Sequence, residues 1–393
     1  MNSPKIRFKG YTEDWEQRKL GEIITEYKET VDSECTLPIL TSSKTEGVIL
    51  QEEHFGRKQQ HDITGYNILP RNYCTYRNRS DGVDFTFNIN KCCDKGIISK
   101  FYPVFSGKNS DVFFLTLVLN NSDEVVREIA YTCTGTGQKV LSFLDLQKMK
   151  VRVPSYDEQK EIAAYFENLD HLITLHQRKL EKIQNMKKSC LQKMFPKDGA
   201  NVPEIRFSEF QGDWEERTLG SCFDERLESL PDGELLSVTI GSGIKKFSEL
   251  DRHDNSNTDK SKYKRVCIGD IAYNSMRMWQ GASGRSPYEG IVSPAYTVVK
   301  PIGDIDTQFF AYMFKKKEII HLFEINSQGL TSDTWNLKYP AFSKIVVRVP
   351  RNVEEQSRIA RFLLELDELI SCTEQEIEIT KRMKKGCLQK MFV

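Results

Sequence analysis

The chain has 393 residues, of which 39% are apolar and 28% charged, a composition typical of a folded globular protein rather than a disordered or fibrous one. Lys plus Arg and Asp plus Glu both number 56, so an anionic partner has to be met by local basic patches and not by net charge. The longest apolar run, residues 112–119, is far shorter than the roughly 20 residues of a membrane span, and we expect no membrane contact. No apolar signal segment opens the sequence and no C-x-x-C pair occurs among ten cysteines, so we expect a cytoplasmic protein with reduced thiols and no zinc ribbon.

In chain order, the first recognisable element is a segment that occurs twice. Residues 4–21 read PKIRFKGYTEDWEQRKLG, and residues 203–220 read PEIRFSEFQGDWEERTLG. Trp214 therefore lies 199 residues after its equivalent, Trp15. In both copies a variable middle, a short V-R-V-P strand and a long helical segment follow, and the helical segments end in MKKSCLQKMF and MKKGCLQKMF. A duplication of this length indicates two similar halves and an internal pseudo-two-fold repeat.

The two variable middles alternate short β-branched and aromatic runs with Gly, Pro, Asn and Asp, which predicts strands joined by turns. We expect strands within 85–89, 96–105, 264–273 and 290–300. A helix is expected late in each middle, around 111–119 and 307–321. Each middle is therefore predicted to be mixed α and β.

The long helical segments carry apolar residues alternately four and three apart, the heptad pattern of a coiled coil. His176, Thr373 and Thr380 are polar positions in this seam, and no second ligand lies at helical spacing from His176 to make it a metal site. The seam positions are Ile162, Phe166, Leu169, Ile173, His176, Leu180, Ile183, Lys187, Cys190 and Met194, and in the second copy Ile359, Leu363, Leu366, Ile370, Thr373, Ile377, Thr380, Lys384, Cys387 and Met391.

An apolar stripe of this length needs a partner, and the other copy in the same chain is the natural one. Only the linker 196–202 separates the first helix from the second half, so we expect the second helix to run back antiparallel, with the opening segment 4–21 beside its end. The predicted fold class is α+β: two mixed α/β domains separated by two long antiparallel coiled-coil helices. The predicted boundaries are 1–154 for the first domain, 155–195 for the first helix, 196–202 for the linker, 203–350 for the second domain and 351–393 for the second helix.

Motifs for catalysis are missing from the sequence. We find no phosphate-binding G-x-x-x-x-G-K-[ST] loop, no H-x-x-x-H pair, no G-x-S-x-G elbow and no amino-methyltransferase [ND]-P-P-[YF] motif. We therefore predict no catalytic residue and no metal site in this chain.

The local charge agrees better with nucleic-acid binding than with catalysis. Residues 54–108 hold nine Lys and Arg against four Asp and Glu, and residues 244–285 hold nine against five. Because these cations alternate with aromatic and amide side chains, they are typical of surfaces that contact phosphates and base edges. The candidate DNA contacts are Lys44, Arg57, Lys58, Arg77, Asn78, Arg79 and Gln138 in the first half, and Lys245, Lys246, Arg252, Asn274, Arg277, Trp279, Gln280 and Ser332 in the second.

The assembled order of motifs resembles the specificity subunit of Type I restriction-modification systems over essentially the whole chain. The resemblance rests on the W-E-x-R-x-L-G openings at Trp15 and Trp214, on V-R-V-P followed by Glu-Gln, on the run GDIAYNSMRMWQG from Gly269, and on the two C-L-Q-K-M-F helix ends. The combination is specific, whereas each phrase alone is weak.

This resemblance implies a non-catalytic, sequence-specific DNA-binding subunit. It implies that each domain reads one half of a bipartite site on double-stranded DNA, and that the helices set the spacer and dock two modification subunits. S-adenosylmethionine, ATP and Mg are expected in the modification and restriction subunits and not in this chain. Because the two middles differ, the half-sites should differ and the target should be asymmetric. A stand-alone methyltransferase or nuclease and a coiled-coil tether without a DNA role stay open as alternatives.

Overall fold

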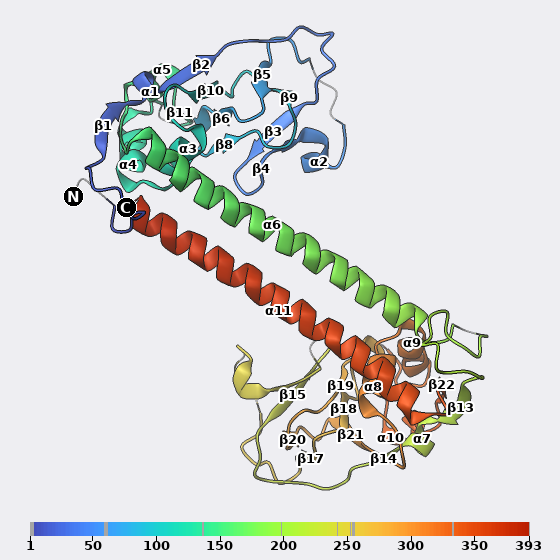
Figure 1. Ribbon diagram of the computed structural model, residues 1–393. Coiled ribbons are helices and arrows are strands. Elements are labelled where there is room, and N and C mark those ends of the chain that lie inside the picture. Colours follow the sequence, from blue (N-terminus) through green and yellow to red (C-terminus); the bar gives the residue numbers. More distant parts are fainter. Residues whose placement is uncertain are drawn as a thin grey trace. The chain divides into compact units, whose positions relative to one another are not determined.

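The computed structural model describes residues 4–58, 62–135, 137–197, 199–241, 243–251, 253, 256–331 and 334–392. The chain divides into two compact units: unit 1 comprises 1–177 with 375–393, and unit 2 comprises 178–374. Two long helices, α6 (Tyr156–Lys193) and α11 (Val353–Met391), each contribute one part to unit 1 and the other part to unit 2 (Figure 1). The boundary between the two units therefore falls inside both long helices, whereas the boundaries predicted from the sequence keep each helix as one segment.

Unit 1 holds a four-stranded antiparallel sheet in the order β2-β10-β6-β8, around which smaller strand pairs and short helices are placed. Its elements before α6 are β1 (Glu16–Lys19), α1 (Leu20–Ile23), β2 (Ile24–Tyr27), β3 (Leu40–Ser43), β4 (Gly47–Leu50), α2 (Gln51–Phe55), β5 (Asn67–Pro70), β6 (Cys74–Tyr76), β7 (Arg79–Ser80), β8 (Phe87–Ile89), β9 (Lys95–Ile98), β10 (Val104–Gly107), α3 (Val112–Asn121), α4 (Asp123–Thr132), β11 (Lys139–Val140), α5 (Phe143–Lys148) and β12 (Lys150–Val153).

Unit 2 repeats this plan with a four-stranded sheet in the order β14-β21-β18-β19. Its elements before α11 are β13 (Glu215–Thr218), α7 (Leu219–Cys222), β14 (Phe223–Glu225), β15 (Leu236–Thr239), β16 (Gly243–Lys246), the 3-10 helix η1 (Phe247–Glu249), β17 (Lys264–Val266), β18 (Ile271–Asn274), the 3-10 helix η2 (Met278–Gln280), β19 (Ser283–Arg285), β20 (Gly290–Val292), β21 (Tyr296–Pro301), α8 (Thr307–Met313), α9 (Lys317–Ile325), α10 (Tyr339–Phe342) and β22 (Val346–Val349). The α+β prediction is confirmed.

The V-R-V-P motif forms the same structure in both units. β12 pairs antiparallel with β1 of the opening segment, and β22 pairs in the same way with β13. In β12 and β22, alternate side chains are buried, as expected for strands with one face on a core. The opening segment and the strand before each long helix are therefore two parts of one small sheet.

The predicted heptad seam is buried in both helices. Every described seam position is buried or half-buried, including Thr373, which donates a 2.7 Å hydrogen bond to the Leu369 carbonyl. In unit 1, Lys384 Nζ of α11 lies 2.5 Å from Asp170 Oδ1 of α6; the equivalent pair in unit 2 is Lys187 of α6 with Asp367 of α11. His176 Nδ1 lies 2.8 Å from Glu376 Oε2, at an angle outside hydrogen-bond geometry.

These contacts run in opposite chain directions in unit 1, because Tyr165 meets Cys387 while His176 meets Glu376. The two helices are therefore antiparallel where they pack, as the seam predicts.

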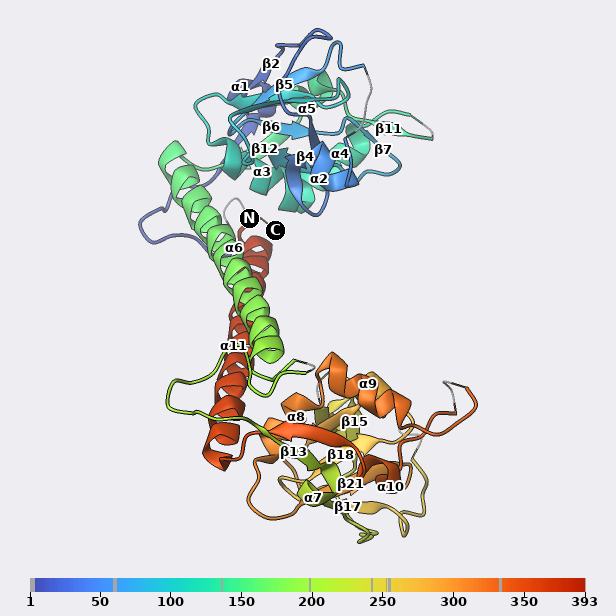
Figure 2. The ribbon, with the colours of Figure 1, turned by 90° about the vertical axis from the view of Figure 1, so that its right-hand side faces the viewer.

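Residues from both ends of the sequence meet in unit 1. Lys5 N donates a 3.0 Å hydrogen bond to the Lys390 carbonyl, and Phe392 packs against Trp15 and Phe114. The N and C labels lie side by side in both views (Figures 1 and 2). In unit 2 the continuous chain forms the matching contacts, with Phe195 against Trp214 and Phe309. The expected placement of the opening segment at the end of the second helix is confirmed.

The strand predictions were too long. Region 96–105 forms the separate strands β9 and β10, 264–273 forms β17 and β18, and 290–300 forms β20 and β21. Turns divide them: Gly269 adopts φ 93°, and Asp270 Oδ2 accepts a 2.8 Å bond from Cys267 N. The helix expected over 307–321 is two helices, α8 and α9, with the chain turning at 314–316 between them.

No helix in the described part of the chain is long and apolar enough to span a membrane.

Candidate nucleic-acid interface

In unit 1, the loop after β6 is fixed to a neighbouring loop and to a hairpin. Asn78 N donates to the Phe101 carbonyl at 2.9 Å, and the Asn78 carbonyl accepts a 3.0 Å bond from Leu141 N. Leu141 follows the hairpin 134–140, which is closed by a bridge between Thr134 and Val140. The Tyr76 hydroxyl donates to the Leu141 carbonyl at 3.1 Å, and burial raises the pKa of Tyr76, so the hydroxyl keeps the proton that it donates. The loop and the hairpin are therefore presented together.

Three of the predicted DNA contacts line one hollow of about 430 Å³ beside this loop. These are Lys44, from the turn between β3 and β4, Arg77, from the loop after β6, and Arg79, from the short strand β7. The Arg79 guanidinium lies 4.4 Å from the centre of the partly exposed Phe101 ring, a cation–π contact. The hollow is thus a preformed basic site.

Acidic side chains also line this hollow. Lys44 Nζ lies 2.5 Å from Asp84 Oδ2, and Asp81 belongs to the same rim. Both members of the Lys44 pair are exposed, so water and salt screen their attraction and the lysine can exchange this partner for a phosphate at low cost. Sequence reasoning missed Phe101, Asp81 and Asp84, although the two aspartates follow Arg79 closely in the sequence.

The other candidates of unit 1 lie outside this hollow. Arg57 and Lys58 follow α2 and are exposed, with Lys58 Nζ 4.0 Å from Glu52 Oε2. Gln138 is exposed in the hairpin 134–140. Asn78 lies in the loop, but its Oδ1 atom is buried and has no hydrogen-bond partner among the described residues, so this atom is turned away from the surface.

Unit 2 builds the equivalent junction from different side chains. Leu337 N donates to the Ser275 carbonyl at 2.8 Å, and Ser275 lies 197 residues after Asn78 in the repeat. The hairpin that precedes Leu337 is closed by a bridge between Gln328 and Asn336. Gly329 in this hairpin has φ 148°, and a Cβ there would come within 2.6 Å of the Thr334 backbone, as a Cβ on Gly135 would come within 2.3 Å of the Gln138 carbonyl. Both hairpins therefore require glycine at the same place.

The loop 274–280 of unit 2 brings four predicted contacts together and adds an aromatic side chain that the sequence reasoning missed. Trp279 packs edge to face on Trp335 of the hairpin, with ring centres 5.3 Å apart. Trp279 Nε1 donates to the Met276 carbonyl at 3.0 Å, Asn274 Oδ1 accepts from Met276 N at 3.1 Å, and Arg277 Nη1 lies 3.4 Å from Gln280 Oε1. Alignment of the two copies could have pointed to Trp335, because it occupies the position in the second hairpin that Lys139 occupies in the first.

Lys245 and Lys246 lie on β16, away from this aromatic pair. Lys246 Nζ lies 5.2 Å from the Tyr288 ring centre, and Lys245 lines a hollow of about 560 Å³ together with Arg285 and Lys315. The remaining two candidates, Arg252 and Ser332, lie outside the described residues.

Lys315 connects the loops of unit 2. Its Nζ donates to the carbonyls of Ile240, Gly281 and Ser283 at 3.0, 2.6 and 2.8 Å. Ile240 belongs to the turn between β15 and β16, and Gly281 ends η2, so one ammonium group ties the basic β15–β16 hairpin to the Trp279 loop. Burial, together with the charge of Lys187, lowers the pKa of Lys315 to about 8. A solitary lysine gives no sequence signal for such a role.

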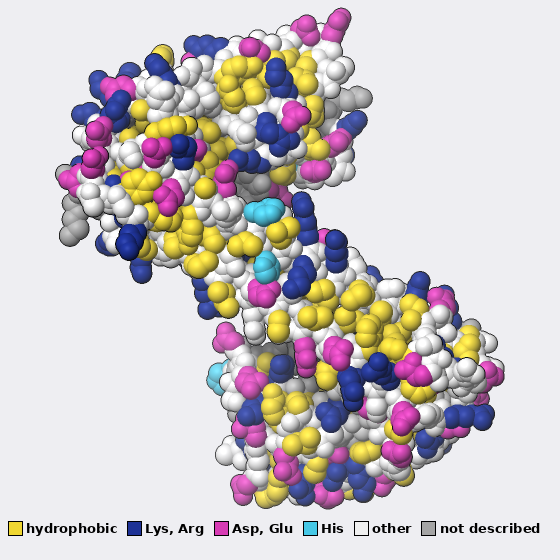
Figure 3. Space-filling model, viewed as in Figure 1, with side chains coloured by type: hydrophobic (Ala, Val, Ile, Leu, Met, Phe, Trp, Pro, Cys, Tyr) yellow, Lys and Arg dark blue, Asp and Glu magenta, His cyan; other side chains and the backbone are white. Residues whose placement is uncertain are grey.

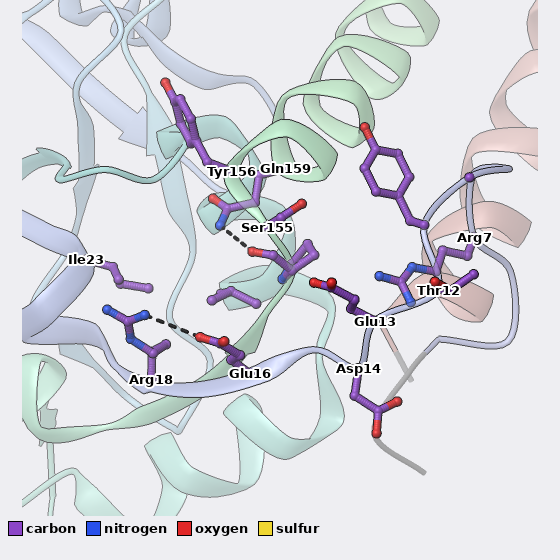
Figure 4. Close-up of a pocket in the computed structure, with 14 residues that line it drawn as sticks. Arg7, Thr12, Glu13, Asp14, Glu16, Arg18, Ile23, Ser155, Tyr156 and Gln159 are labelled. Carbon is purple, nitrogen blue, oxygen red and sulfur yellow. Dashed lines mark hydrogen bonds and ion pairs between the residues drawn. The ribbon is translucent and has the colours of Figure 1, made fainter.

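A further hollow of about 430 Å³ in unit 1 lies between the opening segment and the start of α6 (Figure 4). Its polar side chains largely satisfy one another: Gln159 Nε2 donates to the Pro154 carbonyl at 2.9 Å, and Arg18 Nη1 lies 3.4 Å from Glu16 Oε2. Arg7, which also lines the hollow, forms a bidentate pair with the buried Glu158. These contacts explain the hollow as part of the junction between strand and helix.

No group of three or more His, Cys, Asp or Glu side chains that could hold a metal ion occurs among the residues that the structure describes.

Both units also expose apolar side chains on their helices at positions equivalent in the repeat. Unit 1 exposes Leu172 on α6, and unit 2 exposes Leu369, 197 residues later, on α11. In the same way Met383 of α11 is exposed in unit 1 and Met186 of α6 in unit 2. Figure 3 shows hydrophobic side chains at the surface of the long helices, between lysines and carboxylates. Each unit therefore exposes apolar side chains at the same helix positions.

Comparison with known proteins relates this geometry to one family. Residues 12–185 match the family described as Type I restriction modification DNA specificity domain, and the second half repeats the motifs of that region. A curated relative from Methanocaldococcus jannaschii, the Type I restriction enzyme MjaVIII specificity subunit, is 22% identical over 325 residues, which covers 74% of this chain and 72% of the relative.

A solved structure shares the fold. The S subunit of a Type I restriction-modification system from M. genitalium superposes with a TM-score of 0.60 at 14% identity, covering 100% of this chain and 99% of that chain. The HsdS subunit from Thermoanaerobacter tengcongensis gives a TM-score of 0.45 at 15% identity, with 96% of each chain covered.

Proposed function

We propose that this chain is a Type I restriction-modification DNA specificity subunit, and that each of its two loop–hairpin surfaces reads one half of a bipartite, asymmetric site on double-stranded DNA. The observation that carries this proposal is the recurrence of one junction with different side chains. Asn78 bonded to Leu141 and Ser275 bonded to Leu337 place a loop and a hairpin in the same way, whereas the surfaces are basic in unit 1 and aromatic in unit 2. One scaffold that presents two different surfaces is what two different half-sites require.

The cations of unit 1 support contact with phosphates and guanine. Arginine binds the O6 and N7 atoms of guanine bidentately in the major groove. Arg79 lies over the Phe101 ring, with Arg77 and Lys44 around the same hollow. The individual base contacts among the candidate residues of both units are part of this proposal.

We also propose that α6 and α11 set the spacer between the half-sites and dock two modification subunits. The equivalent exposed residues Leu172 and Leu369 support two equal docking surfaces, because a repeated partner needs a repeated surface. In this view residues 1–154 and 203–350 form the recognition domains, 155–195 and 351–393 the spacer helices, and 196–202 the linker.

Methylation and cleavage are then the work of other subunits. S-adenosylmethionine would be bound by the modification subunits, and ATP and Mg by the restriction subunits that join the complex. The ten cysteines of this chain are all free thiols, which favours the reducing cytoplasm as the compartment of the complex.

The test is the methylation pattern of DNA from cells that express this chain with its modification subunit. We expect one bipartite, asymmetric motif. Exchange of residues 21–148 for the corresponding stretch of a relative should change only one half of that motif, and this identifies the half-site read by unit 1. A change in both halves, or methylation by this chain alone, would contradict the proposal.

A further inference from the structure

An exposed apolar surface occupies the tip of the loop–hairpin junction of unit 2. Met276 is 44% exposed, Trp279 and Trp335 are half-buried against each other, and the Trp279 indole nitrogen bonds to the Met276 carbonyl. Apolar side chains grouped in this way on a solvent-facing loop mark a surface that contacts a partner.

Two polar side-chain groups of this loop are engaged within it. The indole Nε1 of Trp279 donates to the Met276 carbonyl at 3.0 Å, and the amide oxygen of Asn274 accepts from Met276 N at 3.1 Å. An indole nitrogen is a donor only, so its single hydrogen is already used. Trp279 can therefore offer a partner its hydrocarbon surface and not a hydrogen bond.

The place of this surface in the repeat argues for DNA as the partner. Ser275, which begins the loop, is equivalent to Asn78, and in unit 1 that position adjoins Arg77 and Arg79 of the basic hollow. The apolar surface of unit 2 thus stands where unit 1 carries its guanidinium groups. Two units that face the same kind of partner with equivalent loops differ here in the chemistry of recognition.

Base edges offer few apolar groups. In the major groove of unmodified DNA the C5-methyl group of thymine is the one alkyl group displayed, and apolar side chains recognise thymine through it. A surface with Met276, Trp279 and Trp335 at its tip matches this group in size and in its lack of hydrogen-bonding capacity.

Building on the proposed function, we propose that Met276, Trp279 and Trp335 form a thymine-methyl reading surface, so that the half-site read by unit 2 contains thymine recognised by apolar contact. Unit 1 reads its half-site by charged and polar contacts and does not depend on thymine methyl groups. The two halves of the target are then distinguished by different physical interactions.

The test replaces thymine by deoxyuridine, which keeps every hydrogen-bonding group and removes only the methyl group. The full chain in complex with its modification subunits is titrated with duplexes that carry the motif found by methylation sequencing. Substitution of the thymines in the unit 2 half-site should weaken binding about four-fold for each contacted methyl group, corresponding to about 0.8 kcal/mol for one buried carbon group. Substitution in the unit 1 half-site should leave binding unchanged.

Two variants assign the effect to this surface. Met276→Gln keeps the length of an exposed side chain and removes its apolar end, and Trp335→Leu shortens the hairpin side of the surface. Both should bring the ratio of thymine to deoxyuridine affinity toward one. Arg79→Gln in unit 1 is the matched control, which should weaken binding to both duplexes and leave that ratio intact.

Failure of this inference is separable from failure of the proposed function. If the complex binds one motif specifically but deoxyuridine in the unit 2 half-site costs nothing, or if that half-site contains no thymine on either strand, the thymine-methyl surface is refuted while specific recognition stands. A complex without any sequence preference would instead refute the proposed function.

Discussion

Arg7 donates from Nε and Nη2 to the two carboxylate oxygens of Glu158, both at 2.7 Å, and so attaches the opening segment to the first turn of α6. The carboxylate is fully buried and the arginine is 14% exposed. Unit 2 repeats the bidentate pair with Arg206 and Glu355, and adds Trp214 Nε1 as a third donor at 3.2 Å. In both units, the link between the opening segment and the long helix is therefore an ion pair sheltered from water.

Replacement of Arg7 by Met should destabilise unit 1 by about 3 to 5 kcal/mol, because it leaves the buried Glu158 carboxylate without a partner. The double variant Arg7→Met, Glu158→Met should recover much of this loss, since both buried charges are then removed. The free energy of unfolding from urea titration measures both effects.

The control for this prediction is Arg18→Met, whose partners Glu16 and Glu22 are exposed. An exposed pair contributes at most about 1 kcal/mol, so this variant should stay close to the parent protein. Equal losses for Arg7→Met and Arg18→Met would contradict the importance of the buried pair.

Lys315 gives the stability of the protein a dependence on pH. Its pKa is lowered from 10.5 in a free side chain to about 8 by burial and by the charge of Lys187. At a pH between these two pKa values, the Lys315 side chain is protonated more often in the unfolded chain than in the folded one. The free energy of unfolding should therefore rise with pH from this group, by up to about 1.4 kcal/mol per pH unit.

Urea unfolding between pH 7.5 and 10 measures this contribution as the difference between the parent and Lys315→Met. The variant should lack the rise, and it should also loosen the β15–β16 hairpin, whose Ile240 carbonyl loses its donor. Lys317→Met, at an exposed lysine, is the control and should keep the slope of the parent. If the free energy of unfolding of Lys315→Met rises with pH as steeply as that of the parent, the Lys315 amine of the parent titrates like an exposed lysine.

The ruler role of the long helices can be tested by lengthening them together. Four residues inserted after Gln177 and four after Glu374, equivalent positions of the repeat, add about one turn, or roughly 6 Å, to both helices. The unread spacer of the methylated motif should grow by about two base pairs at 3.4 Å per pair. An insertion into one helix alone shifts the seam and should destabilise the protein instead. An unchanged spacer in the double insertion would refute the ruler.

The number of docking surfaces can be measured from the mass of the complex. Leu172→Glu should remove the docking surface of unit 1 and Leu369→Glu that of unit 2, because each places a carboxylate where an apolar contact is proposed. Native mass spectrometry should show two bound modification subunits for the parent, one for each single variant and none for the double variant. Gln177→Glu, at an exposed polar position, should keep two. Two bound subunits in the double variant would place the docking surface elsewhere.

The fold was predictable where the sequence carries a period or a repeat. The seam from Ile162 to Met194, its copy from Ile359, and the meeting of the opening segment with the end of α11 all followed from spacing and duplication. These features depend on many residues that act in the same sense, so single exceptions such as His176 did not obscure them.

The site was predictable only in part, because it depends on turns and on side chains distant in sequence. The alternation of β-branched residues in 264–273 does not reveal the positive φ of Gly269 that ends one strand and begins the next. Residue composition drew attention to Arg79 and Trp279. It could not show that Phe101 supports the first, that Trp335 packs on the second, or that Lys315 holds the loop carbonyls. These are tertiary contacts without a local pattern.

The Lys5 and Phe392 contacts also bear on the order in which the protein is completed during translation. Unit 2 is one continuous stretch, 178–374, and can close as soon as its last residues leave the ribosome. Unit 1 begins first but needs α11, since Trp15 and Phe114 pack on Phe392. The half that is synthesised first is thus the half that is completed last, when Phe392 covers the Trp15 and Phe114 rings.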